Sequence, residues 1–351
     1  MTHFKMFQVN NILQTKCRSV IPIMKSVAQD VAFSNKANSV IRTSIFLVLV
    51  SLIGCSEESS LTIPEEHLTT PIPDGFLEIP EELAVLRPFF HKYISVFGVH
   101  TVSSLDTPVE KHLHLAHVLA QWLDSDQDGT PNNPEVVNKL KSVKAWNGIV
   151  KNEQDVDPVL QAIGDLDTDA AQELMRSGGV LWSTEINPPS ASFDPTIEEI
   201  LHLVTQQGYS RVYSDLKEEA GSKIALAMDL ARGGHFEQSS PDSCRDSSGQ
   251  CAQPPGGQYP AGAWYTYQDQ GCDYSCMITE YYFWALTSML GANQGAERCE
   301  RISHEWPLCT RELVETKDIN VFQLMTNSQY SQPTVLPDGT YGGPASVFNK
   351  P

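Results

Sequence analysis

The sequence predicts an α+β fold that is mostly helical. Apolar side chains recur at alternating steps of four and three over 109–123, which is the pattern of an amphipathic helix. Residues 274–290 form a longer apolar stretch that predicts a second, buried helix. A single apolar run over 178–186 predicts a buried strand. The 351-residue chain is long enough to enclose a sizeable core.

Two predicted helices flank an acidic segment in the first half of the chain. Thr107 is placed to cap the first helix, Pro108 to occupy its first position and Glu110 to complete a capping box. Asn133-Pro134 starts the second helix. Between them, Gly129 stands at position 6 of a twelve-residue calcium-loop pattern. The ligands that this pattern predicts are Asp124, Asp126, Asp128, Thr130 through its backbone carbonyl, Asn132 directly or through water, and Glu135.

This helix–loop–helix resembles an EF-hand, and the resemblance implies calcium as a cofactor. It departs from paired EF-hands at Pro131, loop position 8, because proline has no N–H to bond a sister loop. The sequence contains no second loop of this kind. We therefore expect a solitary, structural calcium site. The alternative is a solvated acidic turn that binds no metal.

An apolar run near the N-terminus predicts export. Residues 45–53 are apolar and follow Lys36 and Arg42. The run is shorter than the roughly 20 residues that cross a membrane, so it suits a secretory signal peptide. It ends in Leu52-Ile53-Gly54-Cys55, which resembles the lipobox of bacterial lipoproteins. The resemblance implies cleavage before Cys55 and lipidation of its thiol. The alternative to a lipoprotein signal is an ordinary signal peptide with an incidental cysteine. A separate alternative is that translation starts at Met24.

The lipobox resemblance implies a protein outside the cytoplasm, anchored to a membrane by its N-terminal lipid. Ser56 favours the outer membrane or cell surface, since lipoproteins of the inner membrane often carry Asp there. We expect a leader (1–54), a lipidated tether (55–75), a helical region with the calcium loop (76–150) and a disulfide-stapled region (151–351) packed on it as one unit.

The charge balance limits the classes of partner. The formal net charge is −19, and six of the 24 basic residues lie in the leader, so the processed chain is more acidic still. Nucleic acid is excluded as a partner because phosphate binding requires a basic face. The partners that remain are cations, the membrane that receives the lipid, and an unidentified substrate or surface partner.

The last third of the chain contains six cysteines: Cys244, Cys251, Cys272, Cys276, Cys299 and Cys309. An even number in an exported chain predicts three disulfides. We expect Cys244–Cys251 and Cys299–Cys309 as local pairs, whereas Cys272 and Cys276 either bridge each other or pair elsewhere. A zinc knuckle is the weaker alternative because no CxxC pair is present.

A second candidate metal site lies in a helix expected from Asp194 to Gly208. Glu198 and His202 are four residues apart and share one face of this helix. The segment Glu198-Glu199-Ile200-Leu201-His202 resembles the HExxH helix of zinc metallopeptidases, with Glu198 in place of the first histidine. The resemblance implies that Glu198 and His202 bind zinc or another divalent transition metal and that Glu199 is the general base.

Glu280 is the candidate third ligand. It lies among aromatic residues in the apolar helix, where a carboxylate is costly to bury without a partner. In gluzincins a glutamate on a later helix completes the metal site, and Glu280 resembles that residue. The strand over 178–186 precedes the Glu198 helix, as in zincin-like domains. The resemblance implies a zincin-like, peptidase-like metallohydrolase.

The same residues have structural interpretations. Glu280 could pair with an arginine, and His202 could be a hydrogen-bonded core histidine. The chain would then be a non-catalytic, calcium-stabilised binding module or a pseudoenzyme. The histidines on the helix before the calcium loop are expected to form a polar helix face rather than a metal site: His112, His114 and His117.

Overall fold

The computed structural model describes residues 76–189, 193–236, 254, 258–269 and 272–348. All of these residues belong to one of the two compact units into which the chain divides. The predicted leader, the lipidation at Cys55, the tether and the pair Cys244–Cys251 lie outside the described residues. Within the described part, no helix is long and apolar enough to cross a bilayer.

The described fold is α+β, as predicted, and it contains one small mixed sheet. The strand order is β1-β2-β3-β4, with β1 antiparallel to β2 and the other neighbours parallel. Nearly every strand residue is buried. The strands are β1 (Lys92–Val96), β2 (Val99–Ser103), β3 (Trp146–Val150) and β4 (Gly178–Trp182).

The sequence indicated only β4, because the other strands contain polar residues that the fold buries. Lys92 is 2% exposed, and its ammonium donates to three backbone carbonyls beyond β2. Asn147 in β3 is fully buried. The β1–β2 hairpin turns at Phe97-Gly98, with φ of 51° and 84°. These values match the two-residue turns whose twist suits a hairpin.

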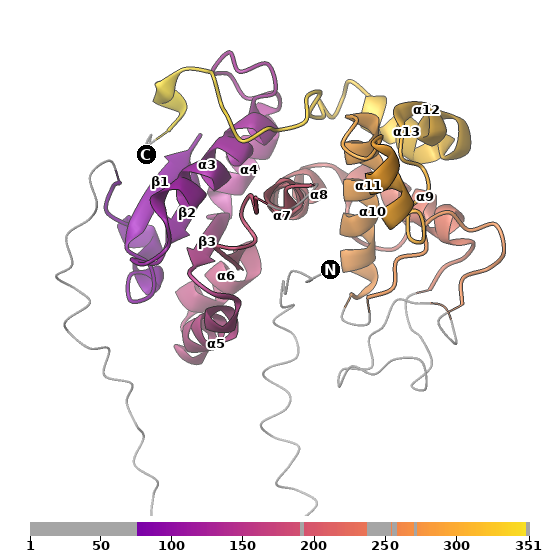
Figure 1. Cartoon of the computed structure of the whole chain (residues 1–351). Helices are drawn as coiled ribbons and strands as arrows, with labels where there is room; N and C mark the ends of the chain where they lie inside the picture. The colour runs from indigo at the N-terminus through magenta and orange to yellow at the C-terminus, as the bar shows by residue number, and fades with distance from the viewer. Residues whose placement is uncertain (1–75, 190–192, 237–253, 255–257, 270–271, 349–351) are drawn as a thin grey trace, which may run out of the picture. The chain divides into compact units, whose positions relative to one another are not determined.

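Helical crossovers connect the parallel strands (Figure 1). The chain passes from β2 to β3 through α3 and α4, and from β3 to β4 through α5 and α6. The predicted calcium loop therefore lies in the first crossover. The helices are α3 (Val109–Leu123), α4 (Pro134–Ser142), α5 (Val156–Asp165), α6 (Asp169–Ser177), α7 (Pro195–Val204), α8 (Ser210–Val212), α9 (Lys223–Arg232), α10 (Tyr274–Met289), α11 (Ala296–Ile302), α12 (Arg311–Lys317) and α13 (Ile319–Thr326).

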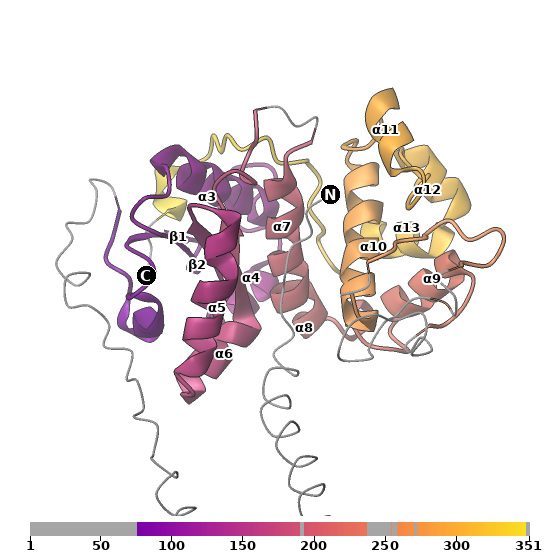
Figure 2. The ribbon, with the colours of Figure 1, turned by 60° about the horizontal axis from the view of Figure 1, so that its bottom comes forward.

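Helix α7 joins the sheet region to the later helices. It contacts α3 and β3 on one side and α10 on the other, and Figure 2 shows α7 and α10 running alongside each other. Helix α10 also contacts α9, α12 and α13. Its residues are almost all buried, as expected for the apolar stretch over 274–290. These contacts place the two helices with candidate metal ligands next to each other.

Two expected helix ends differ in the structure. Thr107 does not cap α3; its hydroxyl donates to the carbonyl of Ile149 (3.0 Å), and α3 begins at Val109. The expected end at Gly208 was wrong, because α7 continues through a turn of π-helix, Thr205–Tyr209, into α8. A Cβ at Gly208 would lie 2.7 Å from Cγ1 of Val136, so this glycine permits close packing on α4.

The expected polar face of α3 was wrong for His112, which is fully buried. Its Nε2 lies 2.8 Å from the Thr101 hydroxyl, and its Nδ1 lies 2.9 Å from the Ser103 hydroxyl. Burial, reinforced by the nearby Lys92 ammonium, lowers the pKa of His112 from 6.5 to about 3. A neutral imidazole therefore joins α3 to β2.

The folded protein should lose stability in acid because His112 resists protonation. The contribution of neutral His112 to the free energy of unfolding is fully present above pH 6.5. It is lost as the pH falls toward 3, because over this range His112 binds a proton only in the unfolded chain. One such group changes the free energy of unfolding by about 1.4 kcal/mol per pH unit. We expect the stability advantage of the native chain over His112→Gln to shrink by about 2 kcal/mol between pH 6.5 and 5. Urea unfolding at both pH values measures it, and an unchanged difference would contradict the assignment.

Candidate metal-binding sites

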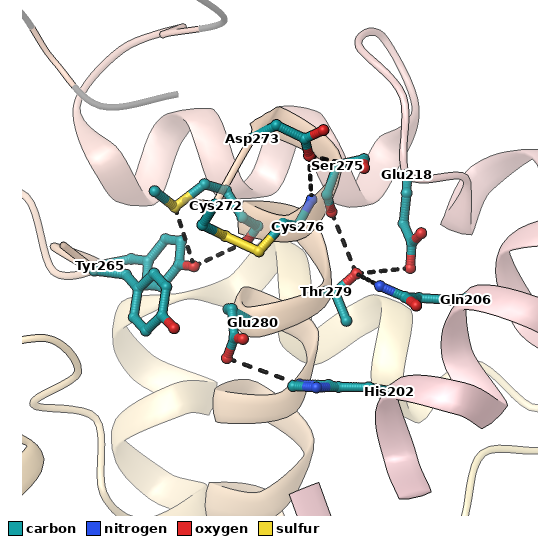
Figure 3. The surroundings of a disulfide bond; sticks show 12 residues. His202, Gln206, Glu218, Tyr265, Cys272, Asp273, Ser275, Cys276, Thr279 and Glu280 are labelled. Atoms are coloured by element: carbon teal, nitrogen blue, oxygen red, sulfur yellow. Dashed lines mark hydrogen bonds and ion pairs between the residues drawn. A yellow bond between two sulfur atoms is a disulfide. The ribbon is translucent and has the colours of Figure 1, made fainter. Parts of the chain in front are cut away.

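Side chains from α7 and α10 meet in a cluster that could hold a metal ion. One ligand atom each from Glu198, His202 and Glu280 lies within 4.8 Å of the other two. His202 Nε2 is 3.7 Å from Glu280 Oε2, and Figure 3 shows the two side chains pointing toward each other. The structure therefore brings together the three transition-metal ligands expected from the sequence.

Local interactions hold the start of α10 in place. The Asp273 side chain caps the helix by accepting from the Cys276 amide (2.9 Å), and a disulfide joins Cys272 to Cys276 (Figure 3). Glu280 follows Cys276 by four residues, about one helical turn. The bond between these cysteines settles the alternative left open by the sequence. The predicted pair Cys299–Cys309 is confirmed.

Polar contacts also connect α10 to the helix that carries His202. The Gln206 amide donates to the Thr279 hydroxyl (3.1 Å), which donates to Glu218 (2.9 Å; Figure 3). Burial raises the pKa of Glu218 to about 7, against the opposing effect of the Thr279 hydrogen bond. Gln206 lies in the π-helical turn, so this irregularity aims a side chain at α10 beside the cluster.

The cluster is withdrawn from water. His202 is 4% exposed and Glu280 is 8% exposed. Burial raises the pKa of Glu280 to about 8, although the neighbouring His202 opposes the shift. Neither His202 Nε2 nor Glu280 Oε2 has a hydrogen-bond partner among the described residues. Buried polar atoms are normally partnered, so these two atoms fit ligands of a cation.

The donor set suits a divalent transition metal. Zinc accepts imidazole nitrogen and carboxylate oxygen at about 2.0–2.2 Å, and ligands at that distance lie roughly 3–4.4 Å apart. The separations within the cluster are compatible with this spacing after small side-chain movements. Two carboxylates with one imidazole also suit iron or manganese. The residues present therefore fit the predicted group without selecting one metal.

Glu199 faces the other nitrogen of the same imidazole. Its Oε2 lies 3.7 Å from Nδ1 of His202, whereas Glu280 approaches Nε2. Glu199 is 4% exposed, and burial, followed by repulsion from Glu198, raises its pKa well above the ordinary value. The residue expected from the sequence to be a general base thus faces Nδ1, at a distance just beyond that of a hydrogen bond.

Glu185 is a further acidic residue of this region that sequence reasoning missed. It follows β4, and burial raises its pKa to about 9, with added repulsion from Glu199 and Glu198. Glu185 is 7% exposed, and its Oε2 has no hydrogen-bond partner in the described part of the chain. No spacing in the sequence relates it to α7, because the fold brings the end of β4 to that helix.

The predicted calcium loop forms a second cluster. Asp124, Asp126 and Asp128 each offer an oxygen within 4.8 Å of the other two. Gly129 has φ of +90°, and its N–H donates to Asp124 Oδ2 (2.8 Å). The pKa of Asp126 is raised, mainly by its hydrogen bond with the Asp124 side chain. Asp124 is fully buried, and its Oδ1 has no hydrogen-bond partner among the described residues.

The closing glutamate of the predicted loop is not part of this cluster. Glu135 is exposed and lies outside it. The Asn132 side chain is bonded to the backbone and hydroxyl of Ser125, at 3.1 and 3.0 Å. The Thr130 amide donates to Asp128 (2.7 Å). The structure thus brings together the first three ligands expected in the loop, and not the closing glutamate.

A C-terminal segment, residues 327–348, covers the calcium loop; the sequence does not indicate this contact. The Tyr341 hydroxyl donates to Asp124 Oδ2 (2.5 Å), and the Gly342 amide donates to Gln127. Pro344 packs so closely on Gly129 that a Cβ there would lie 2.5 Å from its ring. Figure 1 shows this segment in yellow, crossing above α3 and α4. The partner of Asp124 therefore lies more than 200 residues away.

Together, these elements define an α+β protein with one buried histidine–carboxylate cluster and one acidic loop cluster among the described residues. No protein-family model, curated protein or solved structure matches the chain. The resemblances to EF-hands, to lipoproteins and to zincins therefore rest on the motifs alone.

Calcium should stabilise the folded chain through the loop. A ligand that binds only the folded state at a hundredfold excess over Kd adds about 2.7 kcal/mol. For a domain of this size, we expect EGTA to lower Tm by an amount on the order of 5–10 °C. Thermal unfolding followed by circular dichroism, with and without EGTA, measures this.

The double variant Asp126→Asn, Asp128→Asn should lose the response to EGTA, because both acids belong to the cluster. Asp165→Asn is the matched control, since Asp165 is exposed and lies on α5. A native chain whose Tm does not change with EGTA would show that calcium does not occupy the loop.

Proposed function

We propose that this chain is an exported, calcium-stabilised, lipid-anchored metallohydrolase with a peptidase-like site. The observation that carries the proposal is the convergence of Glu198, His202 and Glu280 from two separate helices. The HExxH-like spacing on α7 and the later glutamate on α10 support a zincin-like arrangement. The leader and the lipobox resemblance support export and anchoring.

Glu198, His202 and Glu280 would hold zinc or another divalent transition metal. When bound, such an ion supplies a Lewis acid and lowers the pKa of a coordinated water. The residues of the chain set the conditions for that chemistry. Burial of His202 and Glu280 excludes bulk water, and the spacing along α7 presents two ligands from successive turns.

Glu199 fits an orienting role better than the general-base role implied by the resemblance. A metal-bound imidazole normally donates its other N–H to a carboxylate, which fixes the ring and raises its basicity. Glu199 lies on the Nδ1 side and Glu280 on the Nε2 side of His202. The carboxylate of Glu199 would therefore hold the ring with Nε2 directed toward the metal position.

A second candidate function is a non-catalytic, calcium-stabilised binding module descended from a metallohydrolase. The departure at Glu198 favours this alternative, because a carboxylate replaces the first histidine of the HExxH pattern. Metal content and hydrolysis separate the two functions.

The purified chain should contain one equivalent of zinc, iron or manganese in addition to calcium. His202→Ala and Glu280→Gln should each abolish this equivalent, because each removes one of three ligands. Glu297→Gln is the control, since Glu297 is exposed on α11. Elemental analysis by mass spectrometry measures the ratio, and substoichiometric metal in the native chain would refute the metallohydrolase.

Hydrolysis is the second requirement of the proposal. The metal-loaded native chain should release new amino groups from an unfolded protein such as casein, and His202→Ala should reduce the rate at least a hundredfold. A loaded chain that releases none would leave the binding module as the function.

The role of Glu199 can be separated from that of a general base. Glu199→Gln should lower zinc affinity about 10–100-fold, because the carboxylate that orients His202 is lost. Saturating zinc should then restore hydrolysis. Competition with a fluorescent chelator measures the affinity. Unchanged affinity together with lost hydrolysis at saturating zinc would show that Glu199 is the base.

A further inference from the structure

A guanidinium lies near the cluster and is not one of its three candidate ligands. Arg298 on α11 places its Cζ 4.3 Å from the ring centre of Phe193 and 5.5 Å from that of Trp284. Aromatic faces attract guanidinium groups at these distances. Arg298 is partly buried, and burial lowers its pKa although Glu198 opposes the shift. The charge is therefore kept at an energetic cost.

Among the described residues, the guanidinium of Arg298 is hydrogen-bonded only through its Nε. Its Nε donates to Asn293 Oδ1 (3.2 Å). Asn293 is fully buried and donates to the hydroxyls of Thr287 (3.2 Å) and Ser288 (3.0 Å). The two Nη groups make no hydrogen bond or ion pair with any described residue. The Nε thus orients the side chain, and within the described part of the chain its paired Nη donors have no partner.

The position of Arg298 relates it to the metal ligands. Phe193 precedes the capping residue of α7, whose next turn carries Glu198. Trp284 follows Glu280 on α10 by four residues, so it lies one turn further along the same face. Phe193 also contacts Phe283, which packs edge-on against His202. The guanidinium therefore lies beside the cluster, at its α11 side.

We propose that Arg298 binds a carboxylate of the substrate, so that the substrate of the proposed hydrolase is a peptide-like acyl compound bearing a negative charge near the bond to be cleaved. This inference rests on the proposed function. Guanidinium Nη pairs match a carboxylate by two parallel hydrogen bonds, which a lysine cannot reproduce. The carboxylate is either the C-terminal group of a peptide or an acidic side chain.

Direct binding tests the inference without relying on hydrolysis. The probes are acetyl-Ala-Ala-Ala with a free carboxylate, its C-terminal amide, and acetyl-Ala-Glu-Ala amide, titrated into the purified chain by calorimetry with and without zinc. We expect at least one acidic probe to bind the native chain tenfold or more tightly than the neutral amide. A preference for the free acid identifies a C-terminal carboxylate, and a preference for the glutamate peptide identifies a side chain.

Variants on one helix complete the experiment. Arg298→Gln should remove the preference, and Arg298→Lys should restore only part of it. Arg301→Gln, on the same helix but exposed and paired with Glu297, should keep the preference. Equal binding of acidic and neutral probes, no binding of any probe, or loss of zinc from Arg298→Gln would each overturn the inference. Binding without hydrolysis would instead overturn only the proposed function.

Discussion

The burial of ionisable carboxyl groups around His202 is the constraint on which the rest of the site depends. Glu185, Glu199 and Glu280 are each less than 10% exposed, and burial raises the pKa of all three. Carboxylates in such surroundings are stable only when they share protons, accept hydrogen bonds or coordinate a cation. The disulfide at the start of α10 and the contacts of α10 with α7 keep Glu280 and Glu199 from moving apart into water.

The acidic loop and the buried cluster belong to one framework. Helix α3 ends at the loop and contacts α7. The Trp122 indole donates to the carbonyl of Ile197 (3.0 Å), and His114 lies 2.6 Å from Asp194, the cap of α7. Both contacts reach residues at the start of α7, within four positions before Glu198. The acidic loop is therefore connected through α3 to the helix that presents two of the candidate ligands.

Sequence patterns worked where the deciding geometry is local. The spacing of Glu198 and His202 places them on one helix face whatever surrounds the helix, and the aromatic run around Glu280 required a buried helix. The patterns failed where burial overrode polarity. Three strands contain polar side chains that the fold encloses, and among them Lys92 donates to three backbone carbonyls beyond β2. Gly208 was expected to end a helix, but it lies in the π-helical turn and allows that turn to pack closely on α4.

The sequence by itself indicated the helices that carry the candidate ligands, the acidic loop of Asp124, Asp126 and Asp128, and the identity of three candidate ligands. These properties follow from spacings of a few residues, which backbone geometry converts directly into proximity. Only the tertiary structure decided that Glu280 meets His202, that Glu185 and Arg298 lie beside them, and that the C-terminal segment covers the loop. Those contacts join residues up to more than 200 positions apart, and packing of the whole core selects them.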